Sequence, residues 1–351
     1  RHLRVIIVRR PADRTEYPTG QGPGQERWKE VSAVTDKLYV SPPPFTPGDT
    51  TRKLMGDVII ALIPAVLASG IIFGYQSLIV MAVSVLSCVV LEYICRKVMK
   101  RDNTVTDLSA VVTGILLAFN LPVSIPLWMV FFGAVVAIVV VKQMFGGIGQ
   151  NFVNPALTAR IVMMVSFPTS MSTWNKPFYY LQSSSDALTT ASPLAQNAAG
   201  EAVPSYIDLF LGLRAGCLGE TCVCALLLGG VYLVARRVIK PVIPLCFIGT
   251  VFVFTWILGE DPVFQILSGG LMLGAIFMAT DYTTSPLSTK GRIVFGIGCG
   301  IITVLIRVFG ALPEGVSFSI ILMNILVPHI ENLTRPKPFG EEGKRRGKAK
   351  S

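Results

Sequence analysis

The chain has 351 residues, of which 52% are hydrophobic and only 15% are charged, and it carries a formal net charge of +10. Soluble domains average about 25% charged residues, so this composition excludes an ordinary soluble enzyme and indicates a membrane protein. Lys and Arg form short clusters between apolar stretches, which argues against nucleic acid as a partner. The two His residues, His2 and His329, lie too far apart in the chain for paired haem ligation.

The two ends of the chain are polar and basic. Residues 1–50 are rich in Pro and Gly and lack the apolar core of a signal peptide, so they are predicted to form a disordered cytoplasmic tail. Residues 334–351 are predicted to be a second, basic cytoplasmic tail.

Apolar stretches of spanning or near-spanning length follow one another from Asp57 onward. A membrane helix needs roughly 20 apolar residues, and fewer when it is broken or re-entrant. The sequence therefore predicts an all-helical, polytopic membrane protein with about ten spans, at 58–74, 77–95, 106–121, 125–141, 155–168, 214–235, 242–258, 263–280, 292–311 and 316–333.

The distribution of basic residues tests this topology. Lys and Arg follow the second, fourth, sixth and eighth spans, whereas the connections after the first, third, seventh and ninth spans contain none. Because basic loops remain cytoplasmic, both termini are predicted to be cytoplasmic. Segment 169–205, which follows the fifth span, is then external.

Short stretches of the first half resemble stretches of the second half. Residues 114–119 resemble 270–275, and 145–147 resemble 309–311. This favours two five-helix repeats of opposite orientation, at 51–168 and 206–333, with a pathway between them near the membrane midplane. Chance similarity of Gly-rich apolar sequence is the alternative.

Segment 146–156 is unusual for a membrane protein, since three Gly and three amide residues precede Pro155. Proline suits the first position of a helix, where an N–H has no intrahelical partner. We expect a broken or re-entrant element that includes Asn154 and faces protein or a cavity. A Gly-rich cytoplasmic turn is the alternative.

Three ionisable residues are predicted at membrane depth. Asp281 ends an apolar stretch and is followed by a row of hydroxyl residues, Arg307 lies inside the next span, and Arg160 lies in the fifth. Such groups are costly in a bilayer and mark ion pathways or pair with one another. With Asn154 they are candidate ion-pathway residues, and a structural salt bridge between the repeats is the alternative.

The seven Cys lie mostly inside apolar stretches and form no C-x-x-C pair. They are predicted to be small buried hydrophobes and not a metal or iron–sulfur site.

Five sequence elements occur in a characteristic order: Lys-Leu-Tyr-Val-Ser at 37–41, the apolar segment 57–65, Gly-Gln-Asn-x-x-Asn-Pro-Ala at 149–156, Ala-Thr-Asp-x-x-Thr-Ser-Pro at 279–286, and Pro-Glu-Gly at 313–315. Together they resemble the NqrB/RnfD family over about residues 36–340. Short loops and the Thr-Ser-Pro-Leu sequence favour the RnfD branch. The resemblance implies the inverted five-helix repeats seen in urea transporters.

The family resemblance also implies a flavin site in the external segment. Members carry FMN as a phosphoester on the last Thr of an Asp-x-x-Ser/Thr-x-Ala-Thr-Pro-Leu motif. Asp186, Thr189, Ala191, Pro193 and Leu194 match this motif, but the acceptor position is Ser192, which keeps the required hydroxyl. Thr190 and Thr189 are the alternative acceptors.

By the same resemblance, the chain relays electrons between ferredoxin and NAD+ in a bacterial inner-membrane complex that translocates Na+ or H+. Its expected partners are Rnf subunits of the A, B, C, E and G types and a flavin transferase. A non-covalent riboflavin is also known in the family. The sequence shows no nucleotide-binding Gly motif and no iron–sulfur ligand set, so NAD+ and ferredoxin are expected to bind partner subunits. The rival function is a permease or channel for a small polar solute.

Overall fold

A computed structural model describes residues 50–181, 189–310 and 315–334. The predicted tails fall almost wholly outside this part. The main helices are α2 (Thr51–Phe73), α3 (Tyr75–Val98), α4 (Ser109–Phe119), α5 (Leu127–Ala134) continued by the π-helix η2 (Val135–Gln143), α6 (Pro155–Ser166), α10 (Val223–Ala235), α11 (Val242–Ile257), α14 (Thr289–Phe309) and α15 (Val316–Thr334).

The predicted helical class is confirmed. Four of the described helices, α2, α3, α14 and α15, are long and apolar enough to cross a membrane. At about 1.5 Å per residue, their 19 to 24 residues match a hydrocarbon core of about 30 Å. The other five main helices have between 10 and 17 residues.

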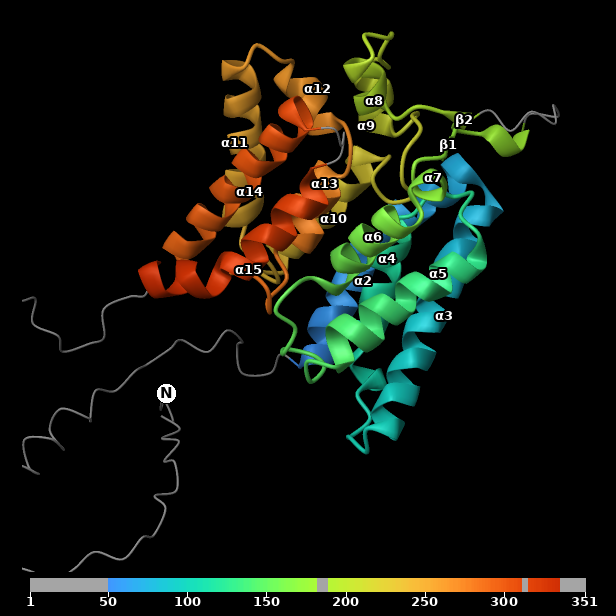
Figure 1. Cartoon of the computed structure of the whole chain (residues 1–351), viewed down its shortest axis with the longest axis vertical. Helices are drawn as coiled ribbons and strands as arrows, with labels where there is room; N and C mark the ends of the chain where they lie inside the picture. Colours follow the sequence, from blue (N-terminus) through green and yellow to red (C-terminus); the bar gives the residue numbers. More distant parts are fainter. Residues whose placement is uncertain (1–49, 182–188, 311–314, 335–351) are drawn as a thin grey trace, which may run out of the picture. The chain divides into compact units, whose positions relative to one another are not determined.

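Helices in the two halves of the described body have corresponding neighbours (Figure 1). In the first half, α3 packs against α4 and the α5–η2 helix, and α6 packs against the latter. In the second half, α11 packs against α12 and α14, and α15 packs against α14. Between the halves, α2 contacts α10 and α6 contacts α15.

The contact between α2 and α10 depends on a glycine. A Cβ at Gly229 would lie 2.1 Å from the Ala61 carbonyl oxygen and 3.0 Å from the Phe277 ring. Small residues allow helix backbones to approach closely in membranes. One turn further along α10, the hydroxyl of Tyr232 donates to the Asp57 carboxylate at 3.1 Å.

We expect Gly229→Val to separate α2 from α10 and to destabilise the protein by about 3 kcal/mol, because the added methyls have no space. Thermal unfolding and size-exclusion profiles in detergent would measure the loss. Gly249→Val is the matched control, since nothing lies within 4 Å of a Cβ at that helical position. Equal melting temperatures for the two variants would contradict the close approach.

The predicted span 263–280 is not one helix. It consists of α12 (Pro262–Leu267) and α13 (Leu271–Leu273), which continues as the π-helix η4 (Gly274–Met278). The chain breaks between them, where Gly269 adopts a φ of +64°. Arg307 donates to the Ser268 carbonyl at 3.1 Å and Arg214 to the Gly269 carbonyl at 3.3 Å. Buried irregular backbone is tolerated because these guanidinium groups replace the missing helical donors.

The predicted span 214–235 is also shorter than expected, because α10 starts only at Val223. The preceding residues form an irregular segment that packs against the end of α4. Gly219 N donates to the Phe119 carbonyl at 3.0 Å, and Leu218 N donates to the Leu121 carbonyl at 3.1 Å. These bonds satisfy carbonyl groups that a helix C-terminus leaves without partners.

The segment between α6 and α10, predicted as a long loop, contains α7 (Pro168–Met171), the antiparallel pair β1 (Trp174–Asn175) and β2 (Thr189–Thr190), α8 (Pro193–Ala198) and α9 (Tyr206–Leu211). It covers one end of the helical body, which we call the loop end (Figure 1). Phe178 N donates to the Ile72 carbonyl at 2.9 Å, and the Tyr180 hydroxyl donates to the Ile71 carbonyl at 2.8 Å. Both bonds attach the segment to the end of α2.

Candidate functional site

Ser192 is the N-cap of α8. Its backbone is extended, with φ of −66° and ψ of 155°, because a residue that precedes a proline is disfavoured in helical conformation. The hydroxyl accepts a hydrogen bond from Ala195 N at 3.3 Å, and the residue is only 5% exposed. Leu194 is buried against Leu209 and Phe264 and attaches α8 to the body.

The other predicted flavin residues are distributed along the same segment. Thr189 and Thr190 form β2, and the Thr190 hydroxyl accepts from the Gln196 amide at 3.3 Å. Asp186 lies outside the described residues.

A cavity of about 280 Å³ lies beside this segment. Its wall combines cationic, hydroxyl and amide side chains with apolar ones, namely Lys176, Pro177, Thr190, Ala191, Pro193, Gln196, Pro204, Leu213, Arg214 and Ala215. We call it the Lys176 cavity. Arg214 is 3% exposed, and its Nε has no hydrogen-bond partner among the described residues. Two positive charges and an unpaired N–H donor suit an anionic ligand such as a phosphate.

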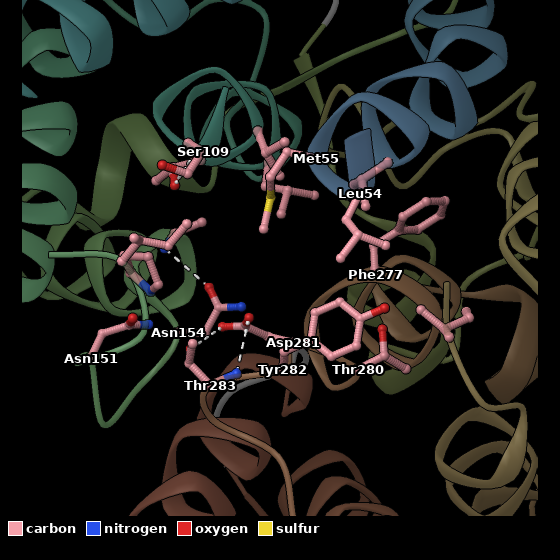
Figure 2. A pocket seen from close by; sticks show the side chains of 18 of the residues that line it. Leu54, Met55, Ser109, Asn151, Asn154, Phe277, Thr280, Asp281, Tyr282 and Thr283 are labelled. Carbon is pink, nitrogen blue, oxygen red and sulfur yellow. Dashed lines mark hydrogen bonds between the residues drawn. The ribbon is translucent and has the colours of Figure 1, made fainter. Parts of the chain in front are cut away.

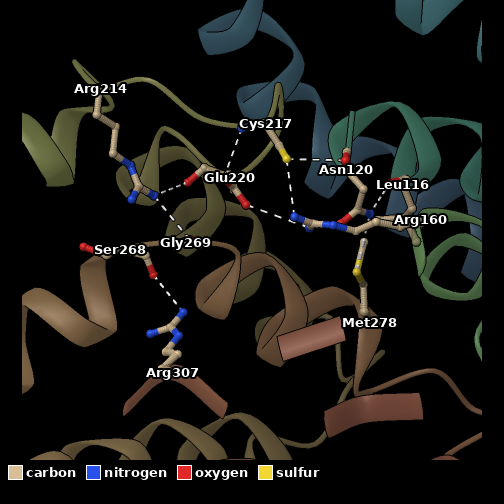
Figure 3. A network of polar contacts seen from close by, with 10 residues as sticks. All are labelled: Leu116, Asn120, Arg160, Arg214, Cys217, Glu220, Ser268, Gly269, Met278 and Arg307. Atoms are coloured by element: carbon tan, nitrogen blue, oxygen red, sulfur yellow. Dashed lines mark hydrogen bonds and ion pairs between the residues drawn. The ribbon is translucent and has the colours of Figure 1, made fainter. Parts of the chain in front are cut away.

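Behind Arg214, a buried charged network lies between the two halves (Figure 3). Arg160 donates to the Asn120 amide oxygen at 2.8 Å and to the Cys217 sulfur at 3.5 Å, and it lies 4.0 Å from the Glu220 carboxylate. Glu220 in turn accepts from Cys217 N at 3.1 Å. We call these residues, with Arg214 and Arg307, the Glu220 network.

Among the residues that the structure describes, the Glu220 network contains three guanidinium groups and one carboxylate. The sequence predicted Arg160 and Arg307 but missed Arg214 and Glu220, although charged residues within a predicted apolar span were a usable signal. Arg160 and Glu220 come from different halves, as the alternative of a structural salt bridge anticipated. Arg307 instead bonds to the backbone carbonyls of the broken helix.

A second cavity, of about 120 Å³, contains Asp281 (Figure 2). The Asp281 carboxylate accepts from the Thr283 hydroxyl at 3.1 Å and the Thr284 hydroxyl at 3.4 Å. Besides Thr283, the polar residues of the lining are Ser109, Thr113, Lys142, Asn151, Asn154, Thr280 and Tyr282. We call it the Asp281 cavity. Leu54, near the start of α2, also lines it, so the cavity and the loop end lie at opposite ends of that helix.

Asn154 connects the Asp281 cavity to the centre of the body. Its amide oxygen accepts from Ala156 N at 3.1 Å and caps α6, which begins at Pro155 as predicted. Its amide nitrogen donates to the Met278 carbonyl at 3.3 Å. The sulfur of Met278 lies 3.8 Å from the Asn120 amide nitrogen of the Glu220 network. Met278 thus contacts both polar regions.

The predicted pathway residues therefore fall into two groups. Asp281 and Asn154 share one cavity, whereas Arg160 and Arg307 belong to the network nearer the loop end.

The NQR2, RnfD, RnfE family matches residues 39–340. The chain belongs to this family.

Among family members, the chain is 48% identical to the D-type component of the Na+-translocating ferredoxin:NAD+ oxidoreductase complex of Acetobacterium woodii, over 83% of this chain and 91% of the relative. It is 42% identical to the D-type component of the proton-translocating ferredoxin:NAD+ oxidoreductase complex of Clostridium ljungdahlii, over 83% and 92%. It is 35% identical to the D-type component of the ion-translocating oxidoreductase complex of Stutzerimonas stutzeri, over 83% and 93%. The expected resemblance is confirmed.

Two of the sequence elements that carry the family resemblance, 149–156 and 279–286, meet at the Asp281 cavity. They come from different halves of the chain. Segments on which membership of the family was predicted thus form part of the wall of this cavity.

Proposed function

We propose that this chain is the D-type component of an ion-translocating ferredoxin:NAD+ oxidoreductase complex in a bacterial inner membrane. The names of the relatives support this proposal, and the match extends over most of each of them. The chain would assemble with Rnf subunits of the A, B, C, E and G types, which bind ferredoxin and NAD+. It contributes to the reaction as one part of the complex and does not catalyse it alone.

The flavin role rests on one observation, the cationic Lys176 cavity beside Ser192. FMN joined to the Ser192 hydroxyl by a flavin transferase would have its phosphate next to this cavity. Lys176 and Arg214 supply the positive charge that a phosphodiester needs, and the unpaired Arg214 Nε supplies a donor. When bound, FMN supplies one- and two-electron redox chemistry. Riboflavin, the other flavin of the family, is not assigned to a cavity.

The protein's own contribution is to position this group. Leu194 fixes the segment against the helical body. Gln196 and Thr190 hydrogen-bond to each other at the cavity wall and are available to orient polar edges of a ligand.

In-gel fluorescence under ultraviolet light tests the flavin role. The complex is expressed with its flavin transferase and denatured, and a fluorescent band at the mass of this chain is expected because a covalent flavin survives denaturation. A permease for a small polar solute, the rival function, would give no fluorescent band.

The proposed cation route uses the Asp281 cavity, with Asn154 at its inner wall and the Glu220 network beyond Met278.

We further propose ten spans arranged as two inverted five-helix repeats. The corresponding neighbours of helices in the two halves support this arrangement. Inverted repeats create a site at their shared interface, and both polar regions use residues of both halves.

Cysteine labelling tests the topology. We expect a membrane-impermeant thiol reagent added from the periplasmic side to label a cysteine at position 184 but not one at position 283, because the basic connections are cytoplasmic. A background without the seven native Cys avoids side reactions. The reverse pattern of labelling would contradict the ten-span topology and the external flavin.

A further inference from the structure

A buried ion pair in the first half has no part in the function proposed above. Lys142, at the end of η2, places its ammonium 2.8 Å from the Glu92 carboxylate of α3 and 2.7 Å from the Ser109 hydroxyl of α4. Lys142 is 3% exposed and Glu92 is 0% exposed. The second carboxylate oxygen of Glu92 accepts from the Thr104 hydroxyl at 2.9 Å.

The same lysine also lines a cavity that contains a second carboxylate. Lys142 and Ser109 are both part of the lining of the Asp281 cavity. Asp281 has hydroxyl and N–H partners, but among the described residues it has no cationic group within 4.0 Å. The ammonium therefore pairs with one carboxylate and shares a cavity with a second one.

Among the described residues, Asp281 is the carboxylate of this region that forms no ion pair. Glu92 and Asp281 contribute two negative charges, and Lys142 contributes a positive charge that is paired with Glu92. Arg96, on the same helix as Glu92, is a second buried cation, but it forms no ion pair with Asp281. An uncompensated buried charge is strongly unfavourable. The negative charge of the Asp281 carboxylate is thus compensated either by a mobile cation or by interaction with the Lys142 ammonium.

We propose that Lys142 is a tethered cation that alternates between Glu92 and Asp281. It pairs with Glu92, as in the structure, while Na+ or a proton occupies the Asp281 carboxylate. It moves toward Asp281 when that cation leaves, and so prevents the cation from binding too tightly to be released. This inference rests on the proposed passage of the cation through this chain.

Two features of Lys142 suit this role. Lysine carries a compact charge on a flexible chain, unlike the planar arginine side chain. Lys142 also lies in a π-helical segment, a local irregularity that is frequent at functional sites. The alternative interpretation is a purely structural ion pair, which would not affect the affinity of the complex for its cation.

Two variants of the whole complex in proteoliposomes separate these interpretations. Glu92→Gln combined with Lys142→Met removes the tethered cation without leaving an unpaired charge. We expect the apparent affinity for the coupling cation to become at least about tenfold tighter, and turnover to fall because release is slower. Ser109→Ala removes one anchor of Lys142 and frees it toward Asp281, so it is expected to shift the affinity in the opposite direction.

Electron-transfer rates measured against Na+ concentration at fixed pH, and against pH at fixed Na+, show which cation responds. Lys97→Met is the control, because this exposed lysine is on α3 but contacts Tyr93, at 6.0 Å from its ring centroid. Opposite shifts for the double variant and Ser109→Ala support the proposal. Wild-type affinities in the assembled variants overturn it, as do shifts in the same direction.

Asp281→Asn distinguishes this failure from a failure of the proposed function. If Asp281→Asn loses its response to the cation while the double variant and Ser109→Ala titrate like wild type, only the role of Lys142 is wrong. If Asp281→Asn keeps a wild-type response, the cation does not pass through this cavity, and the proposal for Lys142 fails with it.

Discussion

Ser192→Ala is expected to abolish covalent flavin fluorescence, whereas Ser192→Thr retains it. The hydroxyl of residue 192 precedes Pro193 and Leu194, as the acceptor does in the family motif, and only a hydroxyl can form the phosphoester. Loss of the N-cap hydrogen bond costs about 1 kcal/mol, so the alanine variant still folds. In-gel fluorescence of the denatured chain, with protein amount measured by staining, gives the result directly.

The matched control for Ser192 is Thr190→Ala, which changes a hydroxyl two residues away that also lies beside the Lys176 cavity. This variant is expected to keep the label. Label that persists on Ser192→Ala and disappears from Thr190→Ala or Thr189→Ala would move the acceptor to that threonine. An unlabelled wild-type chain, expressed with its transferase, would contradict the covalent flavin altogether.

Asp281→Asn is expected to lower cation-dependent turnover by at least about tenfold, the effect of losing roughly 1.4 kcal/mol of electrostatic stabilisation. The amide keeps the size of the carboxylate and can still accept from Thr283, but it carries no charge and takes no proton. Electron transfer in proteoliposomes, measured against Na+ and against pH, checks this expectation. Assembly and flavin content are expected to be normal.

Asp102→Asn is a suitable control for this experiment, because Asp102 is an exposed carboxylate on the connection after α3. Its turnover is expected to equal that of the wild type. Loss of the assembled complex with Asp281→Asn would show that the carboxylate is structural, while an unchanged cation response would exclude Asp281 from the pathway.

Local sequence chemistry predicted the start of α6 well. Pro155 cannot donate, and the amide of Asn154 caps the two N–H groups that follow, so the relevant partners are within three residues of each other. The helical class was equally accessible, since long apolar stretches with few charges describe the spanning helices.

The broken helix was not predictable by the same means. Residues 263–280 are almost uniformly apolar, and the break at Gly269 is stable only because Arg307 and Arg214 approach from distant parts of the chain. Local rules contain no information about these donors. Glu220 lay inside a predicted apolar span and could have been singled out for that reason, but its partner Arg160, sixty residues earlier, could not be read from the local sequence.

Lys142 shows a different limit of sequence reasoning. The distribution of charges treats it as a topology signal after the fourth span, which predicts a side chain in a loop at the membrane surface. The structure instead buries it against Glu92, fifty residues earlier in the chain. From the sequence alone, a lysine at the end of an apolar helix fits both a surface loop and a buried ion pair. Only the carboxylate that pairs with it, which is distant in the chain, distinguishes the two locations.

Arg214 belongs both to the wall of the Lys176 cavity and to the Glu220 network, where its guanidinium bonds to the Glu220 and Gly269 carbonyls. Under the proposed function, a phosphate held in the Lys176 cavity therefore acts electrostatically on the Glu220 network, and on the break at Gly269, through this one shared side chain.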